Sequence, residues 1–349
     1  METLFLLTVL AVVIVLVFDY TNGFHDAANI IATVIASRAM LPMQAVIIVG
    51  VFEFLGPLLG GTAVANTIGK FIDLSDLEAV QSLTILVSGL GGAILWNLYT
   101  WARGIPSSSS HALVGGLIGA ILLAVDASHV AWGFSELFQH GRVTGVMKVL
   151  LALILSPVIG FGAGFLLHRF LRLAFRAASP RINKRLRWGQ YLTAAGLAFS
   201  HGANDAQKSM GILTLILLLG GQIKTFEVPF WVMLACATSL TLGIMSGGWR
   251  IVRTLGFAIY KVRPMHALDS QLTSAGVILT ASMLGAPVST THVVASSIMG
   301  IGASERPKAV RWGKAGDIVT TWLITIPASA FVGAVIYALV QALLRRGQL

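Results

Sequence analysis

An aspartate surrounded by small and polar residues occurs twice in this chain, each time inside a stretch that is otherwise apolar enough to lie in a lipid bilayer. The first copy is Asp26 in NGFHDAANIIAT (residues 22–33), and the second is Asp205 in SHGANDAQKSMG (residues 200–211). A carboxylate at membrane depth is costly and faces a cavity or a partner, so it marks a functional site by default. Any fold of this chain must accommodate two such acids.

The composition indicates the class of protein. Of the 349 residues, 56% are hydrophobic and only 11% are charged, whereas soluble domains carry about 25% charged residues. We expect an all-α polytopic membrane protein of the inner (plasma) membrane, in contact with the lipid bilayer. The net charge of +10 does not indicate a nucleic-acid partner, because the basic residues fall in a few loops between apolar runs. With Cys236 as the single cysteine, neither a disulfide framework nor a Cys-based metal site is available.

Two motifs recur in the same order at nearly the same spacing. Asp26 and Asp205 are 179 positions apart, and IPSSSSHALVGGLIG (105–119) and APVSTTHVVASSIMG (286–300) are 181 positions apart. This period is far too long for a solenoid and indicates duplication of a membrane half. We expect a first membrane repeat over residues 1–168, a basic cytoplasmic linker that forms a loop over 169–188, and a second membrane repeat over 189–349.

The positions of Lys and Arg predict that the repeats are inverted. Five crossings per repeat, or about 10–12 transmembrane segments with re-entrant helices counted, place the second repeat upside down. With the N-terminus outside, 17 of the 24 Lys and Arg residues lie on the cytoplasmic side. Arg345 and Arg346 speak against this topology, because it leaves them on the outer side. We also expect broken or re-entrant helices. The apolar run 3–37 is too long for one straight span and predicts a break near Asn22 and Gly23.

Each copy of the second motif resembles a helix start that is aimed at an anion. Pro presets the helix start, Ser and Thr hydroxyls donate, and the first N–H groups of the helix point at the ligand. Two such elements facing each other would surround a tetrahedral oxyanion with donors. The alternative is that both are N-caps of ordinary helices. His111 and His292 follow the hydroxyls, and they either titrate near neutral pH or are hydrogen-bonded residues of the helix start.

The buried acids suit a complementary role. Asp26 and Asp205 are candidate cation ligands or proton carriers, and the alternative is that each is a structural carboxylate satisfied by hydrogen bonds. Glu53, in VFEFLGPLLGG, is a third intramembrane acid. It either binds a cation or pairs with Lys208 or a histidine. Asp19 lies close to Asp26 in the sequence and is a further polar group for the same cavity.

These residues carry a resemblance to a known family. GANDAQKSMG and GFHDAAN, together with the Pro-x-Ser-Thr-Thr-His element and the FE-x-L-G context of Glu53, resemble the duplicated signature of the PiT (inorganic phosphate transporter) family. The similarity covers nearly the whole chain and is closest to the bacterial low-affinity phosphate permeases. It implies secondary active import of inorganic phosphate across the cytoplasmic membrane, by symport with protons or sodium, in a homodimer.

The resemblance also assigns residues to roles. It implies phosphate binding at the hydroxyl residues Ser108, Ser109, Ser110, Ser289, Thr290 and Thr291. It implies cation or proton coupling at Asp26, Asn29, Glu53, Asn204, Asp205 and Lys208, with His25, His111 and His292 as further candidates. No cofactor and no metal are expected beyond a sodium ion at Asp26, Asn29 and Asp205, so the coupling ion is H+ or Na+.

Two departures from the family signature favour protons as the coupling ion. The sodium-type signature has Asn three residues after each Asp, but Lys208 stands there in the second half, and His25 stands where the first half would have Asn. In a helix, Lys208 and Asp205 at i and i+3 share one face within ion-pair reach. The ammonium would then replace a sodium ion and keep Asp205 ionised. The alternative is that Lys208 snorkels to an interface and leaves a sodium site intact.

Other functions fit the residues less well. Sulfate is the main substrate rival, because serine hydroxyls bind both oxyanions. An anion channel would not line its pore with carboxylates. An intramembrane hydrolase needs one asymmetric set of nucleophile, base and orienting group, whereas here the whole set is duplicated. We therefore expect a transporter and not an enzyme.

Overall fold

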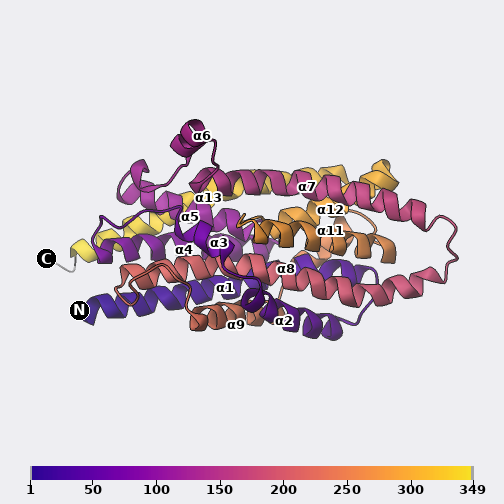
Figure 1. Cartoon of the computed structure of the whole chain (residues 1–349), viewed down its shortest axis with the longest axis horizontal. Coiled ribbons are helices and arrows are strands. Elements are labelled where there is room, and N and C mark those ends of the chain that lie inside the picture. Colours follow the sequence, from indigo (N-terminus) through magenta and orange to yellow (C-terminus); the bar gives the residue numbers. More distant parts are fainter. Residues whose placement is uncertain (1, 347–349) are drawn as a thin grey trace.

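The structure is a computed structural model that describes residues 2–346 as a bundle of helices running along the long axis of the molecule (Figure 1). Within the described residues, the only strand-type pairing is an isolated bridge between Ile72 and Val130. The expected all-α polytopic fold is confirmed. The start of the first helix and the end of the last lie at the same end of the bundle (Figure 1), which requires an even number of crossings.

The elements fall into long helices, a few short helices and single turns. In chain order they are α1 (Glu2–Ala36), α2 (Pro42–Leu59), α3 (Ala63–Gly69), α4 (Ala79–Arg103), α5 (Ser109–Ala124), η1 (Ala127–His129), α6 (Phe134–His140), α7 (Gly145–Ala174), α8 (Ile182–Leu219), α9 (Phe230–Ser246), α10 (Trp249–Arg253), the π-helical η2 (Thr254–Ala258), α11 (Pro264–Met283), α12 (Thr290–Glu305), η3 (Pro307–Ala309) and α13 (Trp312–Arg346).

Within residues 2–346, five helices are long and apolar enough to cross a membrane: α1, α2, α4, α7 and α13. Helix α9 together with α10 and η2 gives a sixth candidate span if the pair, which bends by 59° at the break, is counted as one. In total, ten of the described helices have at least 16 residues. The others in this group are too short or too polar to pass as simple spans, as expected where helices surround a buried polar site.

The Asp motifs lie in unbroken helices, and the break expected near Asn22 and Gly23 is wrong. Helix α1 continues through both residues, and α8 continues through the whole second motif. Gly23 serves close packing, because a Cβ there would lie 2.1 Å from the carbonyl oxygen of Leu240 in α9. Glycine costs a helix only about 1 kcal/mol, and small residues let membrane helices approach closely.

The interruptions occur in other helices. One lies between α2 and α3, and another lies between α9 and α10. Helices α11 and α12 form a hairpin whose tip, residues 284–289, lies in the middle of the molecule (Figure 1). Helix α5 also begins in the middle, and α5 and α12 extend from there toward opposite ends (Figure 1). Two helix N-termini are thereby placed at the centre of the bundle.

The two halves of the chain make matching contacts. Helix α1 packs on α9 as α8 packs on α2, and α5 packs on α13 as α12 packs on α7. Glycines mark the closest approaches, where a Cβ would lie within 2.3 Å of a backbone oxygen. The corresponding pairs are Gly23–Leu240 and Gly202–Glu53 at the first type of contact, and Gly119–Ala330 and Gly300–Phe161 at the second.

The basic segment between the halves is mostly helical, so its assignment as a loop over 169–188 is wrong. Helix α7 extends to Ala174 and α8 begins at Ile182, which leaves only 175–181 as the connection. The seven basic residues lie along the two helix ends and the short link between them. They are Arg169, Arg172, Arg176, Arg181, Lys184, Arg185 and Arg187. Long Lys and Arg side chains at helix ends can reach the membrane interface from there.

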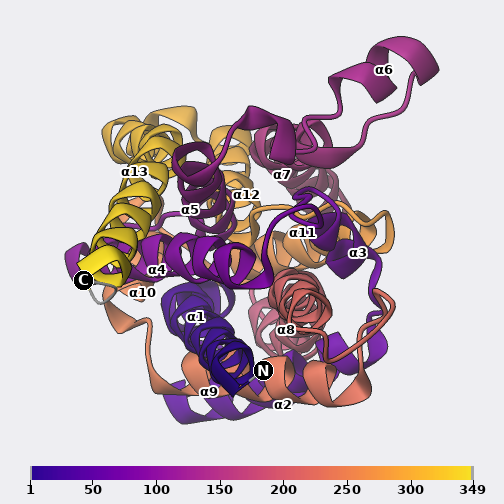
Figure 2. The ribbon, with the colours of Figure 1, turned by 90° about the vertical axis from the view of Figure 1, so that its left-hand side faces the viewer.

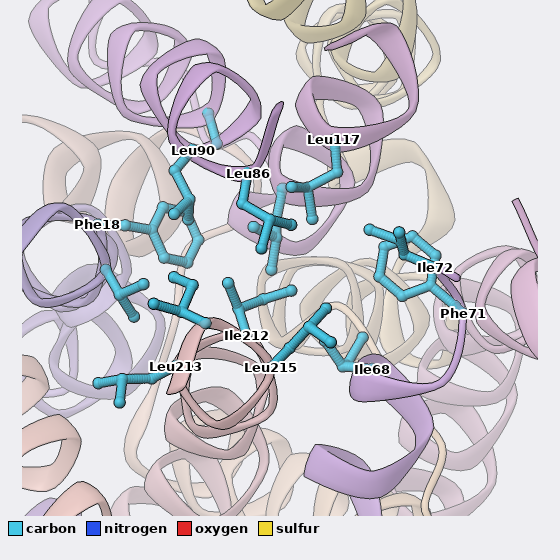
Figure 3. Close-up of a cluster of buried hydrophobic side chains, with 14 of the residues drawn as sticks. Phe18, Ile68, Phe71, Ile72, Leu86, Leu90, Leu117, Ile212, Leu213 and Leu215 are labelled. Atoms are coloured by element: carbon cyan, nitrogen blue, oxygen red, sulfur yellow. The ribbon is translucent and has the colours of Figure 1, made fainter. Parts of the chain in front are cut away.

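An apolar cluster fills the bundle between the polar centre and the end that carries the chain termini. Figure 3 shows Phe18, Leu86, Leu90, Leu117 and Ile212 converging from four helices. Viewed down the long axis, α1 and α8 lie side by side near the middle of the bundle, and α6 projects away from it (Figure 2). Packing of these side chains fixes α1 and α8, which carry the two aspartates.

We predict that Gly202→Ala destabilises the protein by about 1–3 kcal/mol, because the new Cβ would lie 2.3 Å from the Glu53 carbonyl oxygen and force α8 away from α2. Gly196→Ala in the same helix is the matched control, because a Cβ there meets no atom within 4 Å. It should be neutral or stabilise by up to about 1 kcal/mol. Thermal unfolding in detergent measures both. Equal melting temperatures for the two variants would contradict the packing described here.

Candidate functional site

Most of the residues predicted to form the site meet at the centre of the bundle, where α1, α2, α5, α8 and α12 converge. They are buried: none of the hydroxyl, carboxylate, amide and basic residues singled out above exposes more than 6% of its surface. Asp26 comes from α1, Asp205 and Lys208 from α8, and Glu53 from α2. The hydroxyl residues come from the N-termini of α5 and α12.

Asp26 joins both helix N-termini. Ser109 in the first turn of α5 donates a hydrogen bond from Oγ to Oδ2 of Asp26 at 3.0 Å. Thr291 in the first turn of α12 donates to Oδ1 at 3.3 Å. His25 Nδ1 lies 2.7 Å from the same Oδ1, and Asn29 donates to the Thr291 hydroxyl at 2.8 Å. One carboxylate thus holds one hydroxyl from each half of the chain and an imidazole nitrogen.

Asp205 has the corresponding position in the second half. Lys208 forms an ion pair with its Oδ1, and Thr290 donates to its Oδ2 at 3.2 Å. His201 Nε2 also lies 3.2 Å from Oδ2, as an ion-pair contact without hydrogen-bond geometry. Nitrogen groups therefore engage both aspartates.

Lys208 is a fixed internal cation. Only 2% of its surface is exposed, so the snorkelling alternative is wrong, and the predicted pairing with Asp205 is present. The ammonium also donates to Ser110 Oγ at 2.5 Å and to the backbone oxygen of Val288 at 2.9 Å. Val288 lies just before α12, so Lys208 links α8 to both helix N-termini. Removing one partner of such a buried pair costs about 3–5 kcal/mol.

His201 connects Glu53 to this network. Its Nδ1 lies 2.7 Å from Oε1 of Glu53, while its Nε2 faces Asp205. Of the two alternatives for Glu53, the structure shows pairing with a histidine. An imidazole between two carboxylates can take a proton from one side and release it on the other. The sequence reasoning did not include His201, although its place four residues before Asp205 in a helix puts both on one face.

The two capping serines differ in role from the hydroxyl residues that follow them. Ser108 caps α5 by accepting the His111 N–H at 3.2 Å, and Ser289 caps α12 by accepting the His292 N–H at 3.3 Å. For these two serines the ordinary N-cap interpretation holds. Ser109, Ser110, Thr290 and Thr291 instead turn their hydroxyls to the acids, to Lys208 or to the backbone. The positive ends of two helix dipoles lie beside them.

The remaining candidates border the central network. Asn204 donates to the Ala286 backbone oxygen at 3.3 Å in the tip of the α11–α12 hairpin. The rings of His111 and His292 lie 4.6 Å apart, in the first turns of α5 and α12. They border a groove of about 600 Å³ between α7 and α13. Asp19 accepts a hydrogen bond at 2.7 Å from Ser209, which lies four residues after Asp205 in α8.

The centre has the ligand set for a cation as well as for an anion. One ligand atom each from Asp26, His201 and Asp205 lie within 4.8 Å of one another. Hydroxyls, two helix N-termini and an ammonium beside this group are potential donors to an oxyanion. A cation or a proton would neutralise the carboxylates. The hydroxyl groups that now donate to them could then donate to the oxyanion.

Comparison with known proteins gives a consistent result. Residues 22–333 match the family described as "Phosphate transporter family". A protein of Bacillus subtilis (strain 168) named "Probable low-affinity inorganic phosphate transporter" is 43% identical over 340 residues, which cover 97% of this chain and 98% of the relative. A protein of Rhizobium meliloti (strain 1021) with the same name is 41% identical over 328 residues, covering 93% of this chain and 94% of the relative.

One solved structure has the same fold. It is titled "The sodium-dependent phosphate transporter", and it superposes with a TM-score of 0.86 at 24% sequence identity. The match covers 96% of this chain and 99% of the other. At this level of identity the likeness establishes the helix arrangement only. The chemistry of the site has to be argued from the residues of this chain.

Proposed function

The chain belongs to the phosphate transporter family, and on this premise we propose that it imports inorganic phosphate by symport with protons. It is a multi-pass protein of the plasma membrane, and its relatives are transporters and not enzymes. One observation carries the choice of ion: nitrogen groups already engage both central carboxylates, His25 at Asp26 and Lys208 with His201 at Asp205. The Lys208 ammonium occupies the place at Asp205 where a coupling cation would bind.

Shared hydroxyl groups would couple phosphate to the proton. Ser109 and Thr291 both donate to Asp26. Protonation removes the charge of a carboxylate, so it loosens these hydrogen bonds and removes the repulsion against an incoming oxyanion. The released hydroxyls and the adjacent helix N–H groups would then bind phosphate. Binding of the proton therefore favours binding of phosphate, and binding of phosphate favours binding of the proton by the same free energy.

The proton would move through His201. This imidazole lies between Glu53 and Asp205, at 2.7 Å from the first carboxylate and 3.2 Å from the second. Asp205 already forms an ion pair with Lys208, so we leave it out of the groups that carry the transported proton. Glu53 and Asp26, with His25 and His201, are then the groups that we assign to carrying the transported proton.

Alternating access would come from movement of one half against the other. We propose that residues 1–168 and 189–349 are inverted repeats, joined through the basic segment 169–188 on the cytoplasmic side. The matching glycine contacts of the two halves support this assignment. A homodimer is proposed as well, and it rests on the family resemblance alone.

A sodium ion is the second candidate for coupling. The first half keeps an oxygen-rich group at Asp26, with Asn29, Ser109 and Thr291 around it, and the solved neighbour is titled sodium-dependent. Sulfate is the second candidate substrate, because the same hydroxyl and N–H donors fit it. Competition of sulfate with labelled phosphate separates the two substrates.

We predict that Asp26→Asn and Asp205→Asn each abolish coupled uptake while the protein still inserts into the membrane, because each removes a buried charge on which coupling depends. Labelled phosphate uptake into proteoliposomes is the measurement. Asp317→Asn is the matched control, since Asp317 is exposed and pairs only with Lys314, and it should transport like the parent. Near-normal, gradient-driven uptake by both site variants would contradict the prediction.

We predict that Ser109→Ala combined with Thr290→Ala weakens phosphate binding by about 1.5–3 kcal/mol for each lost donor to a charged ligand. Equilibrium binding of labelled phosphate to the purified protein reports the change. Ser296→Ala is the control, because this buried hydroxyl of α12 donates only to the backbone of its own helix at Val293. Unchanged affinity in the double variant would place the phosphate elsewhere.

We predict that Lys208→Asn makes uptake responsive to sodium, because the amide restores the oxygen ligand of the sodium-type signature beside Asp205. Lys208→Arg keeps the positive charge and should remain insensitive to sodium, which controls for the loss of a buried partner. Uptake is measured with and without an inward sodium gradient at fixed pH and membrane potential. A folded, transporting Asn variant without sodium stimulation would refute the role assigned to the ammonium.

A further inference from the structure

Four ionisable side chains meet outside the proposed transport site, toward the end of the bundle that carries the α7–α8 connection (Figure 1). His168 comes from the last turns of α7, and Glu305 is the last residue of α12. His266 and Asp269 come from the first two turns of α11. The cluster therefore lies at the base of the α11–α12 hairpin, whose tip carries part of the proposed phosphate site.

The geometry of the cluster is that of a metal-ligand set. One ligand atom each from His168, His266 and Glu305 lie within 4.8 Å of one another. His168 Nδ1 lies 2.5 Å from Oδ2 of Asp269. Its Nε2 is buried and has no hydrogen-bond partner among the described residues. An imidazole held by a carboxylate through one nitrogen, with the other nitrogen free, is the arrangement found around metal-binding histidines.

We propose that His168, His266 and Glu305 bind a divalent transition-metal ion of the Zn²⁺ type. Two imidazole nitrogens and one carboxylate oxygen are the donor set that Zn²⁺ takes in open, three-ligand sites, and water fills the fourth position. Asp269 contacts Nδ1 of His168 and so orients the ring with Nε2 toward the ion. The Glu305 side chain is 17% exposed, so the ion can enter from that end of the bundle.

Binding requires small rearrangements at two residues. His266 Nε2 now lies 2.8 Å from Glu305, while its Nδ1 accepts the Arg263 N–H at 3.2 Å. A metal on Nε2 moves the ring proton to Nδ1, so the backbone N–H of Arg263 loses this acceptor and must pair with water instead. The Arg263 guanidinium lies 3.9 Å from Glu305 with 56% of the side chain exposed, and the metal replaces it as the countercharge. Tyr260 donates to Glu305 at 2.6 Å and orients the carboxylate.

An ion at this position would fasten both ends of the hairpin to α7. The tip of the same hairpin carries Val288, whose backbone oxygen binds Lys208. The site is not duplicated, because the positions 181 residues before His266 and Glu305 are Ile85 and Ala124, which are not metal ligands. It is therefore separate from the paired transport machinery, and bound metal would restrain one half of the molecule and not the other.

The test is metal binding to the purified full-length protein in lipid nanodiscs without phosphate. Titration with Zn²⁺ should give one ion per chain at this site, and Co²⁺ should give the visible absorption of a tetrahedral centre. Asp269→Asn, which leaves all three ligands in place, should weaken Zn²⁺ binding about 10–100-fold. Glu305→Gln should abolish the Co²⁺ absorption. His140→Ala, at an exposed histidine 3.4 Å from Glu136, is the matched control and should bind like the parent.

Amide hydrogen exchange adds a readout that does not depend on any variant. Zn²⁺ should slow exchange at 259–266 and 303–309 in the parent. Unchanged affinity in both Asp269→Asn and Glu305→Gln would overturn the proposal. So would loss of the Co²⁺ absorption in His201→Gln but not in Glu305→Gln, because the ion would then lie between Asp26 and Asp205. None of these measurements involves transport, so they stand or fall independently of the proposed function.

Discussion

The ion pair between Lys208 and Asp205 is the interaction on which the centre of the molecule depends. Both side chains are removed from water, which costs several kcal/mol for each ion unless the geometry is good and the other polar atoms are satisfied. The structure meets this requirement by giving the ammonium two further acceptors, Ser110 Oγ and the backbone oxygen of Val288. These acceptors lie at the start of α5 and of α12. The same contacts that stabilise the charge therefore bring the two helix N-termini together.

This arrangement links the fold to the proposed transport cycle. Ser109 and Thr291 donate to Asp26 from opposite halves of the chain. A change in the protonation of this one carboxylate would therefore alter hydrogen bonds in both halves. The site is buried on all sides, and phosphate can enter or leave only if the helices move. Because α5 and α12 pack against α13 and α7 through glycine contacts with little spare room, such movement has to be that of packed units and not of single side chains.

The sequence was sufficient for contacts that are local in a helix or repeated between the halves. The i, i+3 spacing predicted the ion pair of Lys208 with Asp205, and the duplicated motifs predicted two central helix starts. Contacts between distant segments could not be predicted. Glu53 meets His201 across 148 positions, and nothing in either local pattern specifies that pairing. The sequence predicts a helix break at Gly23, because the close approach of α9, which is the physical reason for this glycine, is visible only in three dimensions.

The most direct test of proton coupling is concentrative phosphate uptake by the unmodified protein in sodium-free proteoliposomes, with an inward pH gradient as the only driving force and the membrane potential clamped at zero. If Lys208 takes the place of the coupling cation at Asp205, phosphate accumulates inside above the level reached without the gradient, and adding sodium at fixed pH changes nothing. If accumulation fails under the pH gradient and appears only with an inward sodium gradient, the ammonium does not have this role and proton symport is wrong.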